Sequence, residues 1–171
     1  YNAVVHTLCF DVQNKEAVFT AIKTIPTNFS DIDILINNAG VSMRGDFAEL
    51  KPDVFNQVFN TNVIGVTNLT IPAMAHLKVN KGSLIFISSL AGIRGLPGLS
   101  AYCSSKMALR AIAESIRIEE ADSGLHVGLI QVGITEIEFA KQTVGADGKL
   151  QTISDRSKFK VMSMDSVAQA V

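Results

Sequence analysis

The stretch SLIFISSLAGIRGLPGLSAYCSSKMALRAIAESIRIEE, residues 83–120, decides the fold. Its apolar run at 84–87 is short and rich in isoleucine, which predicts a buried strand. A turn rich in glycine follows at 92–98, and apolar residues then recur at helical spacing from 109 to 116. We therefore expect a strand that ends in a glycine turn and continues into an amphipathic helix.

Three polar side chains stand on the two sides of this turn. Ser89 ends the strand, while Tyr102 and Lys106 are four residues apart and so project from one face of the helix. A tyrosine is a poor base at neutral pH, but a neighbouring ammonium lowers its pKa, the direction that general acid–base catalysis needs. A Tyr-x-x-x-Lys pair alone is more typical of a solvated helix face. The order strand, serine, glycine turn, Tyr-x-x-x-Lys favours a catalytic site.

Further motifs accompany this stretch in order along the chain. They are Asp11-Val12, Asn37-Asn38-Ala39-Gly40, Asn62-Val63-Ile64-Gly65, Ser89, and Tyr102-Cys103-Ser104-Ser105-Lys106. With this set the chain resembles the classical short-chain dehydrogenase/reductase family, in which the serine also lies thirteen positions before the tyrosine. The resemblance covers nearly the whole chain and implies an α/β fold with a doubly wound parallel sheet of Rossmann type.

The resemblance implies four catalytic residues. Tyr102 would act as the general acid and base, Ser89 would orient the substrate oxygen, and Lys106 would tune Tyr102 and hold the ribose. Asn62 lies inside a helix predicted at 53–77, although asparagine is a mediocre helix former. In the family this asparagine holds a water that links the lysine to solvent, and such a misfit is expected where a residue serves a site.

The resemblance also implies a site for NAD or NADP at the ends of the strands. Besides Tyr102 and Lys106, its residues would be Asp11 and Val12 at the adenine, and Asn38, Ala39 and Gly40 along the adenosine. Asp11 is also a candidate N-cap for the helix predicted at 13–25. For Asn37 and Asn38, hydrogen bonding at the strand end is an alternative role.

The chain departs from the family pattern after the strand predicted at 125–131. The family has Pro-Gly there and a threonine four residues after that glycine, where this chain has Val132, Gly133 and Ile137. Gly133 still permits close approach of the backbone to the nicotinamide. Thr135 is the candidate substitute for the missing threonine.

We expect one partial domain over residues 1–171, with a catalytic core at 53–121 and a substrate lid at about 138–160. The lid is predicted to be polar and irregular around a turn at 145–148, and a capped helix start is expected at 165–168. The lid cations would suit an anionic substrate group or simply solvate a loop; they are Lys141, Lys149, Arg156, Lys158 and Lys160.

The strands predicted at 3–10, 33–36, 84–87 and 125–131 correspond to the third through sixth of the doubly wound sheet. No glycine-rich phosphate-binding motif occurs near the start. In the order 3-2-1-4-5-6 the first strand here would lie apart from the second. We therefore expect an N-terminal βαβ segment and a C-terminal end beyond the sequence given, which leaves the choice between NAD and NADP open.

Composition excludes several other classes of protein. The 171 residues, 47% hydrophobic and 18% charged with a net charge of −1, suffice for a globular core and show no basic stripe for nucleic acid. The longest apolar runs are strand-sized, so we expect no membrane segment in these residues and a cytoplasmic protein. The two cysteines, Cys9 and Cys103, make no disulfide framework and have no metal-ligand spacing. The histidines are scattered, so no metal site is expected.

The expected function is an NAD(P)-dependent oxidoreductase that moves a hydride between nicotinamide and a secondary alcohol or ketone. The expected partner is a small-molecule alcohol or carbonyl substrate, and the sequence does not identify which one. The helix at 53–77 and the Tyr102 helix commonly form the family's interface, so a homodimer or homotetramer is expected. The alternatives are a non-catalytic nucleotide-binding or scaffold relative, and an epimerase or dehydratase of the same family.

Overall fold

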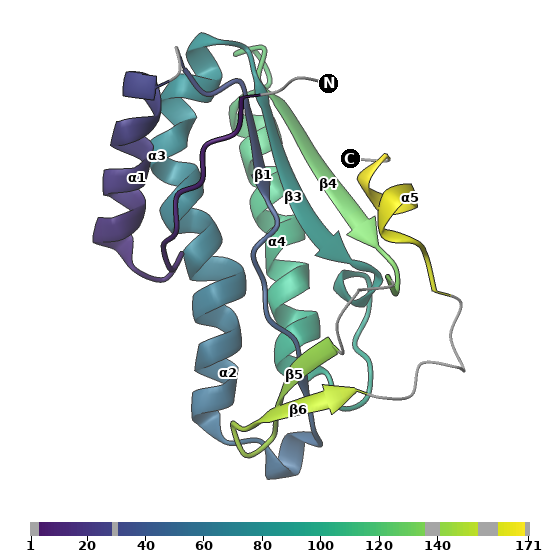
Figure 1. The fold of residues 1–171 in the computed structure, drawn as a ribbon. Coiled ribbons are helices and arrows are strands. Elements are labelled where there is room, and N and C mark those ends of the chain that lie inside the picture. Colours follow the sequence, from purple (N-terminus) through teal and green to yellow (C-terminus); the bar gives the residue numbers. More distant parts are fainter. Residues whose placement is uncertain (1–3, 29–30, 136–140, 154–160, 170–171) are drawn as a thin grey trace.

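The computed structural model describes residues 4–28, 31–135, 141–153 and 161–169 (Figure 1). Its main sheet contains β1 (Ile34–Asn37), β3 (Ser83–Ser89) and β4 (His126–Val132), all parallel, in the order β1–β3–β4. This order agrees with one half of a doubly wound sheet, in which consecutive strands on that side are neighbours.

The long helices pack around one face of this sheet (Figure 1). α3 (Val66–Val79) contacts β1, α4 (Ser100–Glu119) contacts β3 and β4, and α1 (Lys15–Asn28) packs beside α3. α2 (Pro52–Phe59) precedes α3, and a π-helical turn over Asn60–Gly65 joins the two. The single helix expected at 53–77 is therefore interrupted around Asn62.

Alternation along the strands separates a buried face of the sheet from an exposed one. Leu84 and Phe86 of β3 are fully buried among the helices, whereas Ile34 and Ile36 of β1 are exposed. The main core consists of apolar residues from the three long helices and all three strands. Its fully or nearly buried members are Val18, Ile22, Ile32, Val66, Ala73, Leu77, Leu84, Phe86, Leu109, Ala113, Leu125 and Val127.

Residues 4–10, which belong to the first expected strand, form no strand in the structure. Val4 and Val5 are strongly exposed, while Phe10 at the end of the segment packs against the core. A strand exists only where its backbone groups pair with a neighbour, and no described strand lies beside this segment. The prediction was wrong here because strand propensity does not supply a pairing partner.

The described part of the lid is a β-hairpin rather than the irregular loop that we expected. β5 (Lys141–Gly145) and β6 (Leu150–Ile153) pair antiparallel, and β5 also pairs in parallel with the short β2 (Met43–Arg44). Gly148 in the predicted turn has a φ of 86°, a conformation that glycine adopts without strain. The lid is regular because β2, about a hundred residues earlier in the chain, supplies its neighbour.

Three short helical elements complete the described residues: η1 (Phe47–Glu49), η3 (Leu90–Gly92) and α5 (Met164–Ala168). α5 confirms the helix start expected at 165–168. Its cap is Ser163, whose hydroxyl accepts a hydrogen bond from the Ser166 N–H at 3.1 Å.

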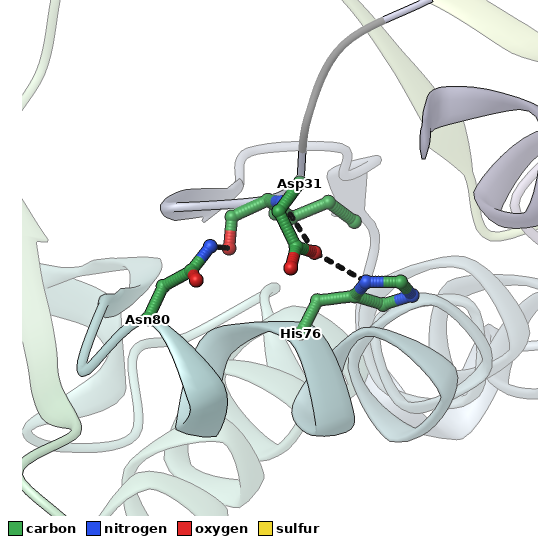
Figure 2. A network of polar contacts seen from close by, with 4 residues as sticks. Asp31, His76 and Asn80 are labelled. Atoms are coloured by element: carbon green, nitrogen blue, oxygen red, sulfur yellow. Dashed lines mark hydrogen bonds and ion pairs between the residues drawn. The ribbon is translucent and has the colours of Figure 1, made fainter. Parts of the chain in front are cut away.

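A polar network fastens the segment before β1 to the last turns of α3 (Figure 2). The carboxylate of Asp31 meets Nδ1 of His76, and Nδ2 of Asn80 donates to the backbone oxygen of Ile32 at 3.4 Å. The pKa of Asp31 is lowered, mainly because its carboxylate accepts a hydrogen bond from the Ile32 N–H, and His76 adds to this effect. The network therefore fixes the start of β1 against the end of α3.

This network predicts an acid dependence of stability. Because folding lowers the pKa of Asp31, its contribution is complete above the unfolded pKa and is lost as pH falls through the folded pKa. We expect the difference in Tm between the wild type and Asp31→Asn to shrink between about pH 5 and pH 3. Thermal unfolding across this range measures it, with Asp33→Asn, an exposed neighbour, as the control. A Tm difference that stays constant down to pH 3 would contradict the prediction.

Candidate active site

The carboxyl ends of the parallel strands open into a cavity of about 400 Å³. This is the edge at which parallel α/β sheets bind ligands. The cavity brings together most of the residues predicted from the sequence: Asn38 and Gly40 after β1, Ser89 at the end of β3, Tyr102 and Lys106 on α4, and Gly133 and Thr135 after β4.

Ser89 and Tyr102 form the centre of this site. Both side chains line the cavity, and the Ser89 hydroxyl accepts a hydrogen bond from the Ala91 N–H at 3.2 Å. Burial raises the pKa of Tyr102, and the nearby Ser89 hydroxyl only partly offsets this. The lowering of the tyrosine pKa that we expected from a lysine neighbour is therefore not what the structure shows.

The position of Lys106 explains that difference. Its Nζ lies 5.9 Å from the centroid of the Tyr102 ring and donates to the backbone oxygen of Ile87 at 2.8 Å. The side chain is buried, with 5% of its surface exposed. In this structure β3 holds the ammonium below the tyrosine ring, so burial dominates the Tyr102 pKa.

The glycine turn after β3 packs directly on the backbone of α4. Ser88 donates to the Lys106 carbonyl at 3.1 Å. A Cβ on Gly92 would lie 2.7 Å from the Ser88 hydroxyl and 3.0 Å from the same carbonyl, so only glycine fits there. No role was predicted for Ser88 from the sequence, although its position next to Ser89 at the strand end could have indicated one.

Asn62 is fully buried and fastens three segments of the site together. Its Oδ1 accepts from the Val41 N–H at 2.7 Å, and its Nδ2 donates to the Val41 carbonyl at 2.9 Å and to the Ser105 hydroxyl at 3.0 Å. A π-helical turn surrounds it, a local irregularity that is frequent at functional sites. The misfit of asparagine in this helix thus reflects a buried hydrogen-bonding role, and its partners Val41 and Ser105 were not foreseen.

Gly40 lies between Asn62 and Lys106. A Cβ at this position would come within 3.3 Å of Asn62 Oδ1 and 3.5 Å of Lys106 Nζ. The bare backbone after β1 therefore lets both side chains approach Gly40, although only Lys106 lines the cavity and Asn62 is buried behind it.

A second, smaller cavity of about 110 Å³ adjoins the other side of the segment after β1. Val12, Asn38 and Ala39 line it, as the sequence predicted for the adenosine side. Asp11 lines neither of the two cavities, and its exposed carboxylate accepts from the Gln13 N–H at 2.9 Å.

The alternative roles for the polar residues near this cavity are now separated. Asn14, not Asp11, caps α1, because its side chain accepts from the Ala17 N–H at 3.0 Å. Asn37 is buried, and its side-chain amide donates a hydrogen bond to the Thr70 hydroxyl at 2.9 Å. This agrees with the alternative role of hydrogen bonding at the strand end. Asn38, by contrast, is exposed and lines both cavities.

Gly65 permits the segment of Val12 to approach the helix layer. A Cβ on Gly65 would lie 2.5 Å from Cγ2 of Val12 and 3.3 Å from the Asn60 carbonyl. We expect Gly65→Ala to displace Val12 and to weaken binding of a nicotinamide dinucleotide by about tenfold or more, since such overpacking costs about 1–3 kcal/mol. Titration of the full-length variant measures this, with Gly95→Ala as the control because a Cβ there meets no atom within 4 Å. An unchanged affinity for Gly65→Ala would contradict the role assigned to Val12.

The end of β4 keeps part of the expected nicotinamide site. Thr135 lines the large cavity, and its hydroxyl lies 3.4 Å from the Gly133 carbonyl that it faces. Its backbone forms an isolated bridge with Met162. Ile137, at the family's threonine position, lies outside the described residues.

The described residues also bear on metal binding, disulfide formation and membrane insertion. No group of three or more His, Cys, Asp or Glu side chains among the described residues is placed to hold a metal ion. Cys9 is exposed and Cys103 is buried, and both are free. Within the described helices, none has the length and apolar character needed to cross a membrane.

The geometry agrees with the motifs, and comparison with known proteins decides the family. A profile described as short chain dehydrogenase matches residues 2–147. The chain belongs to the short-chain dehydrogenase family. Dehydrogenase/reductase SDR family member 7B of Bos taurus is 34% identical over 168 residues, which are 96% of this chain and 51% of that protein. NADP-dependent 3-hydroxy acid dehydrogenase of Schizosaccharomyces pombe is 32% identical over 142 residues, or 82% of this chain and 55% of that protein.

Solved structures of short-chain dehydrogenases share this fold. ElxO with NADP bound matches with a TM-score of 0.73 and 32% identity, over 75% of this chain and 53% of that one. The chain spans about half the length of the curated relatives that it matches.

The two cavities of this short-chain dehydrogenase fit a nicotinamide dinucleotide. They adjoin along the segment after β1, and Asn38 lines both. The larger one offers hydroxyls, an amide and the Lys106 ammonium, which suit a ribose and a carboxamide. The glycines at 40 and 65 leave the backbone bare where a Cβ would crowd the walls of these cavities.

Proposed function

We propose that this protein is an NAD(P)-dependent oxidoreductase acting on a secondary alcohol or ketone. The observation that carries the proposal is that the hydroxyls of Ser89 and Tyr102 line the wall of one cavity together with the buried Lys106. The names of two similar proteins, an NADP-dependent 3-hydroxy acid dehydrogenase and ElxO with NADP bound, support a nicotinamide cofactor.

The chain's own groups would divide the proton chemistry between them. Ser89 would donate a hydrogen bond to the substrate oxygen, and Tyr102 would give up the proton of its hydroxyl as the carbonyl becomes an alcohol. A phenol is protonated at neutral pH, and because burial raises the pKa of Tyr102 further, its proton is present for this step. A bound nicotinamide would supply the hydride.

Lys106 and Asn62 would support this step from behind the tyrosine. The family's role for this lysine, tuning the tyrosine and holding the ribose, is part of the proposal, and the Lys106 ammonium lies 5.9 Å from the centroid of the Tyr102 ring. Asn62 would hold the segment after β1 against α4, and the family's proton relay through this asparagine is part of the proposal. We assign the catalytic core to residues 53–121 and the substrate lid to residues 138–160, within one domain.

Cofactor binding tests the proposal most directly. We expect the full-length protein to bind NADH or NADPH saturably, because both cavity walls carry groups suited to the dinucleotide. A fluorescence titration with each nucleotide measures the affinities, and their ratio gives the preference. Failure of a folded full-length protein to bind either nucleotide would overturn the oxidoreductase proposal and favour a non-catalytic relative. Turnover that changes the substrate without net change of NAD(P)H would favour an epimerase or dehydratase.

We also propose that the protein forms a homodimer or homotetramer through α3 and α4. Ile64 in the π-helical turn before α3, Ile71 of α3 and Ile118 of α4 are large apolar side chains that are exposed. Light scattering of the full-length protein measures its mass, and a monomer at micromolar concentration would overturn this assignment.

A further inference from the structure

The described residues that line the active-site cavity are almost all uncharged. Of the described residues that line it, Lys106 alone carries a charge, and its ammonium already donates to the Ile87 carbonyl. Lys149, one of the lid cations named from the sequence, is strongly exposed, lies 4.0 Å from Asp147 and does not line the cavity. Lys149, the lid cation whose side chain the structure describes, therefore does not face a substrate anion in the cavity.

The lid hairpin is fixed to the helix layer that carries the catalytic tyrosine. Val144 of β5 is buried with Met43, Val54 and Ala101, and Tyr102 packs against this cluster. The Val144 N–H donates to the Ser42 carbonyl at 2.9 Å, and the Lys51 N–H donates to the Ala146 carbonyl at 3.0 Å. One face of the hairpin thus stands at a set position relative to the reacting groups.

That face carries an exposed apolar side chain at the cavity. Leu150 of β6 lies directly opposite Val144 in the antiparallel pair, so both project from the same face. Val144 is buried, whereas Leu150 lines the cavity with 67% of its surface exposed. An exposed leucine at the wall of a cavity, beside a buried valine, offers contact area to an apolar group of a ligand.

Two apolar side chains lie next to another part of the cavity wall. Leu90 and Met162 are both about half exposed, and neither lines the cavity itself. A Cβ on Gly133, which does line the cavity, would lie 3.6 Å from Cδ1 of Leu90 and 3.4 Å from Sδ of Met162. Apolar groups therefore flank the glycine that forms this part of the wall.

We propose that the substrate is an uncharged ketone with an apolar chain, and that Leu150 determines specificity by contacting this chain. The proposal rests on the oxidoreductase function proposed above. A carboxylate placed in this cavity would lose its hydration without meeting a free cation on the described wall, which is costly. An alkyl chain would instead cover Leu150 and gain the free energy of apolar burial.

The test uses the full-length protein with the nicotinamide nucleotide that it binds more tightly. Unbranched methyl ketones of increasing length are compared with oxo acids of the same length, and kcat/KM is measured from NAD(P)H consumption. We expect kcat/KM to rise about two- to fourfold per added methylene. We expect each neutral ketone to exceed its matched oxo acid by at least about tenfold.

Leu150→Lys is the decisive variant, because the side chain is exposed and the substitution leaves no buried gap. We expect it to flatten the chain-length dependence and to shift the ratio of ketone to oxo acid by at least about tenfold toward the acid. Val79→Lys is the control. Val79 is similarly exposed, but it is the last residue of α3 and does not line the cavity. If Leu150→Lys does not fold, Leu150→Gln should still remove the chain-length dependence.

The outcomes separate the two proposals. If the wild type reduces both series equally, or prefers the oxo acids, or if the Leu150 variants keep the wild-type ratio, the assignment of the substrate class is overturned while the oxidoreductase function stands. If a folded protein that binds the nucleotide reduces no ketone of either series, the oxidoreductase proposal fails and this inference fails with it.

Discussion

Replacing Tyr102 with phenylalanine is expected to lower kcat by about 10²- to 10⁴-fold, the usual contribution of a positioned general acid. Phenylalanine keeps the ring that packs against the Val144 cluster but removes the hydroxyl at the cavity wall that Ser89 also lines. The substrate oxygen would then lose its proton donor, while the walls of the dinucleotide site remain. We therefore expect nucleotide affinity to stay within about twofold of the wild type, since the ring and Lys106 keep their places.

Steady-state kinetics and the nucleotide titration on the same preparation test this expectation. Ser104→Ala is the matched control on the same helix turn, because its hydroxyl bonds only to the helix carbonyls of Ser100 and Ala101. Turnover near the wild-type level in Tyr102→Phe would remove the tyrosine from the mechanism. A matched loss in Ser104→Ala would mean that disturbance of the helix, rather than loss of the phenol, explains the effect.

Replacing Asn62 with alanine is expected to destabilise the protein by about 2–5 kcal/mol, the range reached when buried polar partners lose their hydrogen bonds. The variant would leave the N–H and carbonyl of Val41 and the hydroxyl of Ser105 without their amide partner. Because the side chain is fully buried, water cannot replace these bonds without a change of packing. The segment after β1, which lines both cavities, would come loose from α4.

Urea unfolding of the full-length protein measures this loss. Asn60→Ala is the matched control, since Asn60 lies in the same π-helical turn with an exposed side chain and should change stability by less than about 0.5 kcal/mol. Equal effects of the two substitutions would show that the turn, not the buried amide, is what stabilises this region. A stable Asn62→Ala protein would contradict the fastening role altogether.

The central unit of the fold could be predicted because its signals are local. The apolar run at 84–87 located β3 to within a few residues, and the helical spacing from 109 to 116 falls inside α4. Once a strand and the following helix are known, right-handed packing brings the end of the strand close to the first turns of the helix. Ser89 and Tyr102 therefore met as expected, and both line the cavity.

Predictions that depended on a distant partner were less successful. Residues 4–10 have the composition of a strand, but no described strand pairs with them. The lid has the polar composition of a loop, yet residues 141–145 form the strand β5 because they pair with β2. In both cases backbone hydrogen bonding across the sheet, rather than the local residue pattern, set the outcome.

By itself, the sequence determined the family, the order of the three parallel strands and which hydroxyls meet at their carboxyl ends, because these follow from short motifs and from the period of the apolar residues. Tertiary structure alone decided the environment of those groups. Burial raised the pKa of Tyr102 where the Lys106 motif predicted the opposite, since the ammonium is held by Ile87. Packing also gave Asn62 its partners and placed Leu150 at the cavity. Burial and charge proximity are sums over residues from the whole fold, and no local pattern contains them.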